Sequence, residues 1–76
     1  MTHQELATMI DEQLCELAFL HRQEINYIEN YFTGSDESWT FLNEIRRNMA
    51  RCDEIIDECQ RDMLLNKLSE LNHKAA

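Results

Sequence analysis

Apolar residues recur at steps of three and four along two long segments of the chain, the spacing that places them on one face of an α-helix. In the first segment the pattern follows Leu6, Ile10, Leu14, Leu17, His21, Ile25, Ile28 and Phe32. In the second it follows Leu42, Ile45, Met49, Cys52, Ile56, Cys59 and Met63, in the alternating steps of a heptad seam. The spacing therefore predicts an all-α chain of two helices.

Residues that start and stop helices give the expected boundaries. Thr2 and Glu5 have the spacing of a capping box, which predicts a helix over about residues 3–32. The chain has no proline and a single glycine, Gly34, which favours a turn over 33–36. Ser35 or Asp36 can cap a second helix over about 37–72. We expect residues 1–76 to form a single helical hairpin domain.

Folding the chain back at Gly34 brings the two apolar stripes together. In an antiparallel hairpin the numbers of opposite residues have a nearly constant sum, and here that sum is about 70. Ile25 then lies opposite Ile45, and Leu14 lies opposite Ile56. The two stripes agree over their whole length, which predicts an antiparallel, coiled-coil-like pair.

The apolar face of the first helix is wider than one neighbouring helix can cover. A chain of 76 residues also buries little apolar surface by itself. We therefore expect a homodimer in which two hairpins form a four-helix bundle, although a different partner chain can cover the same face. The expected oligomer interface consists of Met9, Leu20, Tyr27, Tyr31, Phe41 and Ile55.

This arrangement resembles the plasmid-encoded RNA-binding hairpins of the Rop type, which dimerise into four-helix bundles. The opening residues MTHQEL are similar to the start of such proteins. The resemblance is one of architecture and does not identify a family. It implies a dimeric, Rop-like RNA-binding regulator as one alternative function.

Charge and cysteine content narrow the class of partner. Fifteen acidic and seven basic residues give a formal charge of −8, which disfavours nucleic acid and anionic lipid and favours a basic protein surface. Three cysteines are an odd number, and no signal peptide or membrane span is indicated. We expect a soluble cytoplasmic protein.

No motif predicts catalysis, a cofactor or a metal site, and we expect no enzyme activity. Glu70 and His73 have the Glu-x-x-His spacing of metal-binding bundles, but they fit a solvated helix end better. Met49, Cys52, Cys59 and Met63 offer soft sulfur ligands for Cu(I), and core packing explains them better. His21 is interpreted as a core or rim histidine. A metal-binding helical bundle is the third alternative.

Acidic residues gather at the end of the hairpin away from the turn. They are Asp11, Glu12, Glu16, Asp53, Glu54, Asp57, Glu58 and Asp62. One interpretation is a solvated surface; the other is a surface that resembles the phosphate rows of nucleic acid and occupies a basic site on a partner protein. Nearer the middle, Arg22 is expected close to Arg46, Arg47 and Arg51, in ion pairs or in contact with phosphates.

Four apolar residues lie off the predicted seam and are expected to contact a partner: Phe19, Leu64, Leu68 and Leu71. The leading hypothesis is a non-catalytic protein-binding module, an adaptor or inhibitor of the kind that phages and plasmids carry. Its acidic surface would bind a basic partner protein.

Overall fold

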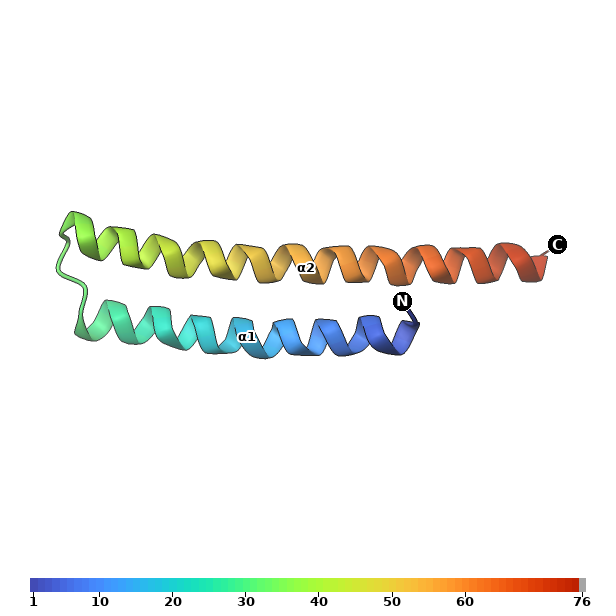
Figure 1. The fold of residues 1–76 in the computed structure, drawn as a ribbon, viewed down its shortest axis with the longest axis horizontal. Coiled ribbons are helices and arrows are strands. Elements are labelled where there is room, and N and C mark those ends of the chain that lie inside the picture. The colour runs from blue at the N-terminus through green and yellow to red at the C-terminus, as the bar shows by residue number, and fades with distance from the viewer. Residues whose placement is uncertain (76) are drawn as a thin grey trace.

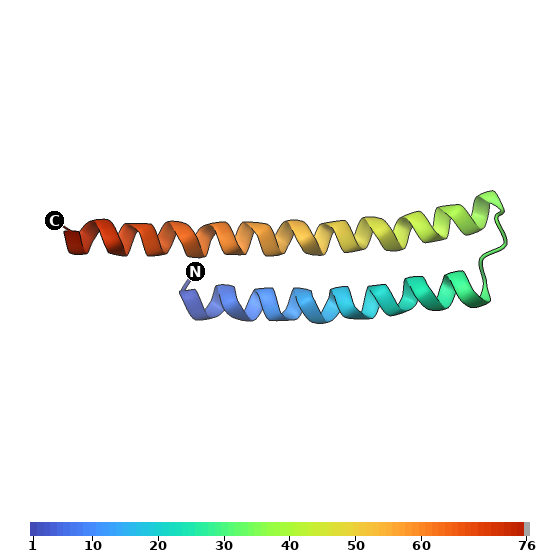
Figure 2. The same cartoon turned by 180° about the vertical axis from the view of Figure 1, so that it is seen from behind.

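The computed structural model describes residues 1–75, and it places two long helices side by side (Figure 1). The first helix, α1, spans His3–Asn30, and the second, α2, spans Asp36–Ala75. They run antiparallel in both views, and α2 extends beyond the start of α1 (Figures 1 and 2). The molecule is a rod with extents of 62 × 18 × 15 Å. The predicted all-α, antiparallel two-helix hairpin is confirmed.

The start of α1 is held by the predicted capping box. The backbone N–H of Glu5 donates to the Thr2 hydroxyl at 3.1 Å, and the Thr2 N–H donates to the Glu5 carboxylate at 3.2 Å. These hydrogen bonds hold the pKa of the Glu5 carboxyl below its ordinary value. Two N–H groups that a helix start leaves without partners are thereby satisfied.

The turn is longer than predicted, because α1 ends at Asn30 rather than at about residue 32. Tyr31 leaves the helical conformation with φ −129°, and the N–H groups of Tyr31 and Phe32 both donate to the Tyr27 carbonyl. Gly34 has φ +80°, a conformation in which a side chain is strained. Ser35 then caps α2, since its hydroxyl accepts from the Ser38 N–H at 3.3 Å.

The seam predicted for α2 is the face that packs against α1. Its buried members are Leu42, Ile45, Cys52, Ile56 and Cys59, while Met49 and Met63 are half-buried. Met49 packs against the cluster that Ile45 and Cys52 form with α1. The alternating steps of three and four therefore identified this face correctly along the whole contact with α1.

The stripe predicted for α1 is only partly correct. Leu6 is buried and Ile10 and Leu17 are half-buried, as expected, but Leu14, Ile25 and Ile28 are 50, 55 and 45% exposed, and His21 is also exposed. The residues that face α2 are Leu6, Ile10, Gln13, Leu17, Leu20, Glu24 and Tyr27. Four predicted positions are each replaced by the residue before them, while Leu17 belongs to both series, because the observed series keeps the same heptad steps as α2.

The predicted register is confirmed, while the individual opposite pairs change. The Arg46 guanidinium Nε donates to the Glu24 carboxylate at 2.9 Å, and the numbers of these residues sum to 70. Glu24 therefore occupies the place expected for Ile25, and Tyr27, whose ring lies 4.5 Å from that of Phe41, occupies the place expected for Ile28. Leu20 likewise replaces His21 beside Met49.

The difference between seam and outer leucines can be measured on α2. Leu42 is 2% exposed and Leu68 is 54% exposed, and both lie within the helix. We expect Leu42→Ala to lower the free energy of unfolding by about 2 to 5 kcal/mol because it leaves a cavity. Leu68→Ala should change it by less than about 0.5 kcal/mol. Urea unfolding followed by circular dichroism measures both, and equal losses would contradict this assignment of the seam.

Candidate protein-binding surfaces

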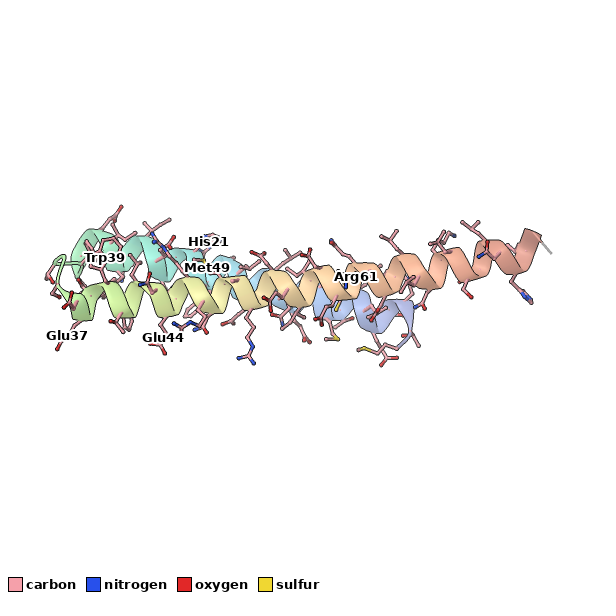
Figure 3. The ribbon with its side chains drawn as sticks, turned by 90° about the horizontal axis from the view of Figure 1, so that it is seen from above. His21, Glu37, Trp39, Glu44, Met49 and Arg61 are labelled. Atoms are coloured by element: carbon pink, nitrogen blue, oxygen red, sulfur yellow. The ribbon has the colours of Figure 1, made fainter. Side chains whose placement is uncertain are left out.

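Two long sides of the hairpin flank the seam and present different chemistry. We call them the Trp39 side and the Phe41 side. Figure 3 shows Trp39 and His21 projecting from one side and Glu37 and Glu44 from the other. Residues seven apart lie two helical turns apart on the same side of a helix, so each side can be followed along the rod.

The Phe41 side carries the aromatic part of the predicted oligomer interface. Tyr27 packs between Phe41, at 4.5 Å between ring centroids, and Tyr31, at 6.1 Å. Phe41 and Tyr31 remain exposed, and Met9 and Ile55 are half-buried. Leu20, the sixth predicted member, lies instead in the hairpin's own core. The structure therefore brings Tyr27, Tyr31 and Phe41 together and separates Leu20 from them.

The Trp39 side carries apolar residues that sequence reasoning assigned to the seam. Leu14, His21 and Ile28 recur every seven residues along α1, with Ile25 between them, and all four are exposed. On α2 the corresponding residues are Trp39, Arg46, Asp53 and Gln60. The Trp39 ring packs edge-on against Phe32 of the turn, with centroids 5.0 Å apart, and stays 46% exposed.

The eight acids predicted to bind a partner lie at one level of the rod, and we call them the acidic band. All eight are exposed. By the register, Asp11 lies level with residue 59 and Glu16 with residue 54, so the acids of α1 fall within the length of those of α2. The band therefore spans the rise from Asp53 to Asp62, about 14 Å along the axis. Their positions in the heptads differ, so the acids surround the rod and do not share one side.

The arginines do not form the single patch that was expected. Arg46 pairs with Glu24 at the edge of the seam. Arg47 lies two heptads from Arg61 on the surface of α2 that faces away from α1, and Arg22 lies on the surface of α1 that faces away from α2. Arg22 and Arg47 therefore point in opposite directions. One flat phosphate surface cannot contact both of them at once.

The predicted apolar contacts fall in two separate places. Phe19 is 56% exposed and lies level with residue 51 of α2. Leu64, Leu68 and Leu71 are 65, 54 and 50% exposed and belong to the end of α2. That end passes the start of α1, where Thr2 and His3 border a shallow depression beside Asn66, Lys67 and Glu70. The structure does not bring Phe19 to the leucines.

The sulfur-containing residues of α2 pack in the core. Cys52 and Cys59 are 5 and 4% exposed, whereas Cys15 is exposed. Burial, with the nearby Glu16 and Asp53 carboxylates, raises the pKa of the Cys52 thiol. Glu70 lies 3.9 Å from the Lys67 ammonium. Within residues 1–75 we find no group of three side chains placed to hold a metal ion.

No protein-family model matches the chain, and no curated protein or solved structure compared with it is significantly similar. The surfaces described above therefore carry the functional argument alone. Neither helix, over the residues described, is long and apolar enough to cross a membrane.

Thiol reactivity provides a test of these placements. We expect brief alkylation of the native protein to modify Cys15 first, because it is exposed, and to spare Cys52 and Cys59. Cys52 is protected twice, since its raised pKa also lowers the thiolate fraction at any given pH. Peptide mass spectrometry with and without urea measures each site. Modification of Cys52 as fast as Cys15 without urea would contradict its place in the core.

Proposed function

We propose that this chain is a non-catalytic protein-binding module, an adaptor or inhibitor whose acidic band occupies a basic site on a partner protein. The observation that carries this proposal is the concentration of charge. The band holds eight of the fifteen acidic residues, and the remaining seven equal the number of basic residues. One of those basic residues, Arg61, lies within the same section of α2, so this section carries a net formal charge of −7 out of the −8 of the whole chain.

The charge density of the band approaches that of nucleic acid. Eight carboxylates less the charge of Arg61, within about 14 Å, amount to one net negative charge per about 2 Å. Duplex DNA carries one per about 1.7 Å of its axis. A rod 15 to 18 Å thick with this density has the charge that a phosphate-binding groove attracts.

The carboxylates of the band are available for such a contact. The ion pairs found within residues 1–75 join Glu24 to Arg46 and Lys67 to Glu70, and no band residue takes part in them. A basic partner would therefore not have to break existing ion pairs, and its approach would be steered by charge. Phe19, exposed at the turn-side edge of the band, adds an apolar contact next to the charges.

We further propose that the module acts as a homodimer in which two hairpins form a four-helix bundle. Exposed apolar residues on the long sides support this, since a lone hairpin leaves them in water and a second hairpin covers those of one side. The two alternative functions, RNA binding and metal binding, require different observations. Rop-like RNA binding needs the arginines to contact phosphates despite the net charge, and a metal-binding bundle needs metal to copurify with the protein.

Charge reversal at positions away from both the seam and the Trp39 side tests the leading proposal. We expect Glu12→Lys, Glu54→Lys and Glu58→Lys together to abolish capture of basic proteins from a native lysate. The control triple, Glu29→Lys, Glu37→Lys and Glu44→Lys, changes the net charge equally but lies outside the band, and it should capture them normally. Mass spectrometry identifies the captured proteins, and circular dichroism checks helicity.

Salt and a second set of variants separate the alternatives. Capture through the band should weaken as salt rises, while Phe19→Ala should weaken it with little change in salt dependence. Equal capture by both lysine triples would overturn the proposal. If reversal of Arg22, Arg47 and Arg51 removes binding to RNA that the unchanged protein binds, the RNA-binding function takes its place.

A further inference from the structure

The hairpin exposes more surface than a folded protein of its mass. Its accessible surface is 6086 Å², whereas a compact monomer of 9.1 kDa exposes about 4900 Å². The rod shape accounts for the excess of about 1200 Å² per copy. Twice that area falls in the range of stable homodimer interfaces. A second copy is thus the occupant that the area fits.

Charge decides which side the second copy covers. The Phe41 side carries seven acids and one arginine, Arg51, along its length: Glu5, Glu12, Glu16, Glu37, Glu44, Glu58 and Asp62. Two such sides facing each other would bring like charges together, which opposes pairing. The Trp39 side carries four acids and three basic residues, so its charge is nearly balanced: Asp11, Asp36, Asp53 and Asp57 with Arg46, Lys67 and Lys74. On this side α1 has no charged residue from Leu14 to Ile28.

The apolar series of α1 on the Trp39 side is symmetric about His21. When two copies of a helix pack antiparallel, opposite residues again have numbers with a nearly constant sum. Leu14 and Ile28 sum to 42, Ala18 and Ile25 sum to 43, and His21 meets its own copy at 42. Each leucine or isoleucine of the series therefore faces an apolar residue of the second copy.

The same side of α2 is symmetric as well, and its charges are complementary. Arg46 and Asp53 sum to 99, as do Trp39 and Gln60, while Asn43 and Asp57 sum to 100. Antiparallel pairing thus places each Arg46 opposite an Asp53, and each Asp57 opposite an amide that can donate to it. Ala50 lies at the centre, where a small side chain lets the two helices approach.

A single two-fold axis serves both helices. The centre of the α1 series is residue 21, which the hairpin register places level with residue 49 of α2. The centre of the α2 series lies between residues 49 and 50, within about 1.5 Å of that level. Two independent series in the sequence therefore have the same centre of symmetry, as an isologous interface requires.

We infer that the Trp39 side is the surface through which two copies of this chain pair, antiparallel and with His21 at the two-fold axis. The inference rests on the dimerisation included in the proposed function, and it names the face, the register and the ion pair. Each helix lies on its own copy, so all neighbouring helices of the bundle run antiparallel. The acidic bands lie on opposite sides of the axis and do not face each other. Asp53 and Asp57 of each band pair across the dimer interface, which leaves the other six acids of the band for a basic partner.

Exchange of the ion-pair partners tests the interface. Sedimentation equilibrium of the unchanged protein should give about 18 kDa, twice the chain mass of 9.1 kDa. Arg46→Asp alone places Asp opposite Asp53, and Asp53→Arg alone places Arg opposite Arg46, so each variant should weaken dimerisation at least tenfold. An equimolar mixture restores both pairs between chains, because every contact of residue 46 with residue 53 then joins Asp to Arg. The loss of the Glu24–Arg46 pair inside the Arg46→Asp chain is the same alone and in the mixture, so recovery in the mixture reports the contact between chains. The mixture should return to about 18 kDa.

Cross-linking supplies a second readout that does not depend on charge. In a Cys15→Ser background, a chain with Leu14→Cys mixed with a chain with Ile28→Cys should be joined rapidly by a short bismaleimide. Leu14→Cys alone should not be joined to its own copy, because those residues are about 21 Å apart along an antiparallel pair. Phe19→Cys, on the opposite side, is the matched control and should remain single.

The outcomes separate this inference from the proposed function. A dimer that neither charge variant weakens, or a mixture that stays monomeric while both variants are helical by circular dichroism, would overturn the Trp39-side interface. Rapid joining of Leu14→Cys to itself would overturn the antiparallel register, and a monomeric unchanged protein would overturn dimerisation altogether. Binding of basic partners through the band is measured with the lysine triples, whose positions lie off the Trp39 side.

Discussion

The structure depends on one constraint, namely that the two helices must place their contact residues with the same heptad spacing. The seam of α2 alternates steps of three and four without interruption from Leu42 to Met63. The residues of α1 that face α2 have the same heptad spacing, even though this places Gln13 and Glu24 at seam positions. The ion pair of Glu24 with Arg46 satisfies the one charge that this choice draws inward. This choice of seam residues also leaves Ile25 and Ile28 exposed on the surface of α1.

Sequence reasoning succeeded where one signal was unambiguous. The capping box, the turn at Gly34, the seam of α2 and the register of the hairpin all followed from local chemistry or from simple numbering. The orientation of α1 did not, because two apolar series lie side by side on it. The predicted series advances in steps of four, four and three, an eleven-residue repeat whose supercoil has the opposite hand to that of a heptad. Only a series with the heptad spacing of α2 fits the contact, and that spacing identifies Leu20 and Tyr27 as the seam residues of α1.

The surfaces also divide into features that the sequence predicts and features that depend on the rotation of each helix. The level of the charged residues relative to one another was readable from the sequence, so the acidic residues were expected together; in the structure they lie beside the middle of α2 and not at its free end. Their direction around the rod was not readable, because it depends on the rotation of each helix. The arginines of the middle section therefore seemed to share a patch, although Arg22 and Arg47 lie on opposite outer surfaces. The rotation also separates an uncharged α1 strip on the Trp39 side from the acids of the Phe41 side.

The register of the hairpin also sets an order for folding. Contacts near the turn close short loops: Phe32 and Trp39 are seven residues apart, while Glu24 and Arg46 are 22 apart. Leu6, which borders the same depression as Asp62, closes a loop of more than fifty residues. Because the entropy lost on closing a loop grows with its length, the helices join most readily beside Gly34 and then zip toward the free ends. The capping box at Thr2 therefore stabilises the part of α1 that docks last.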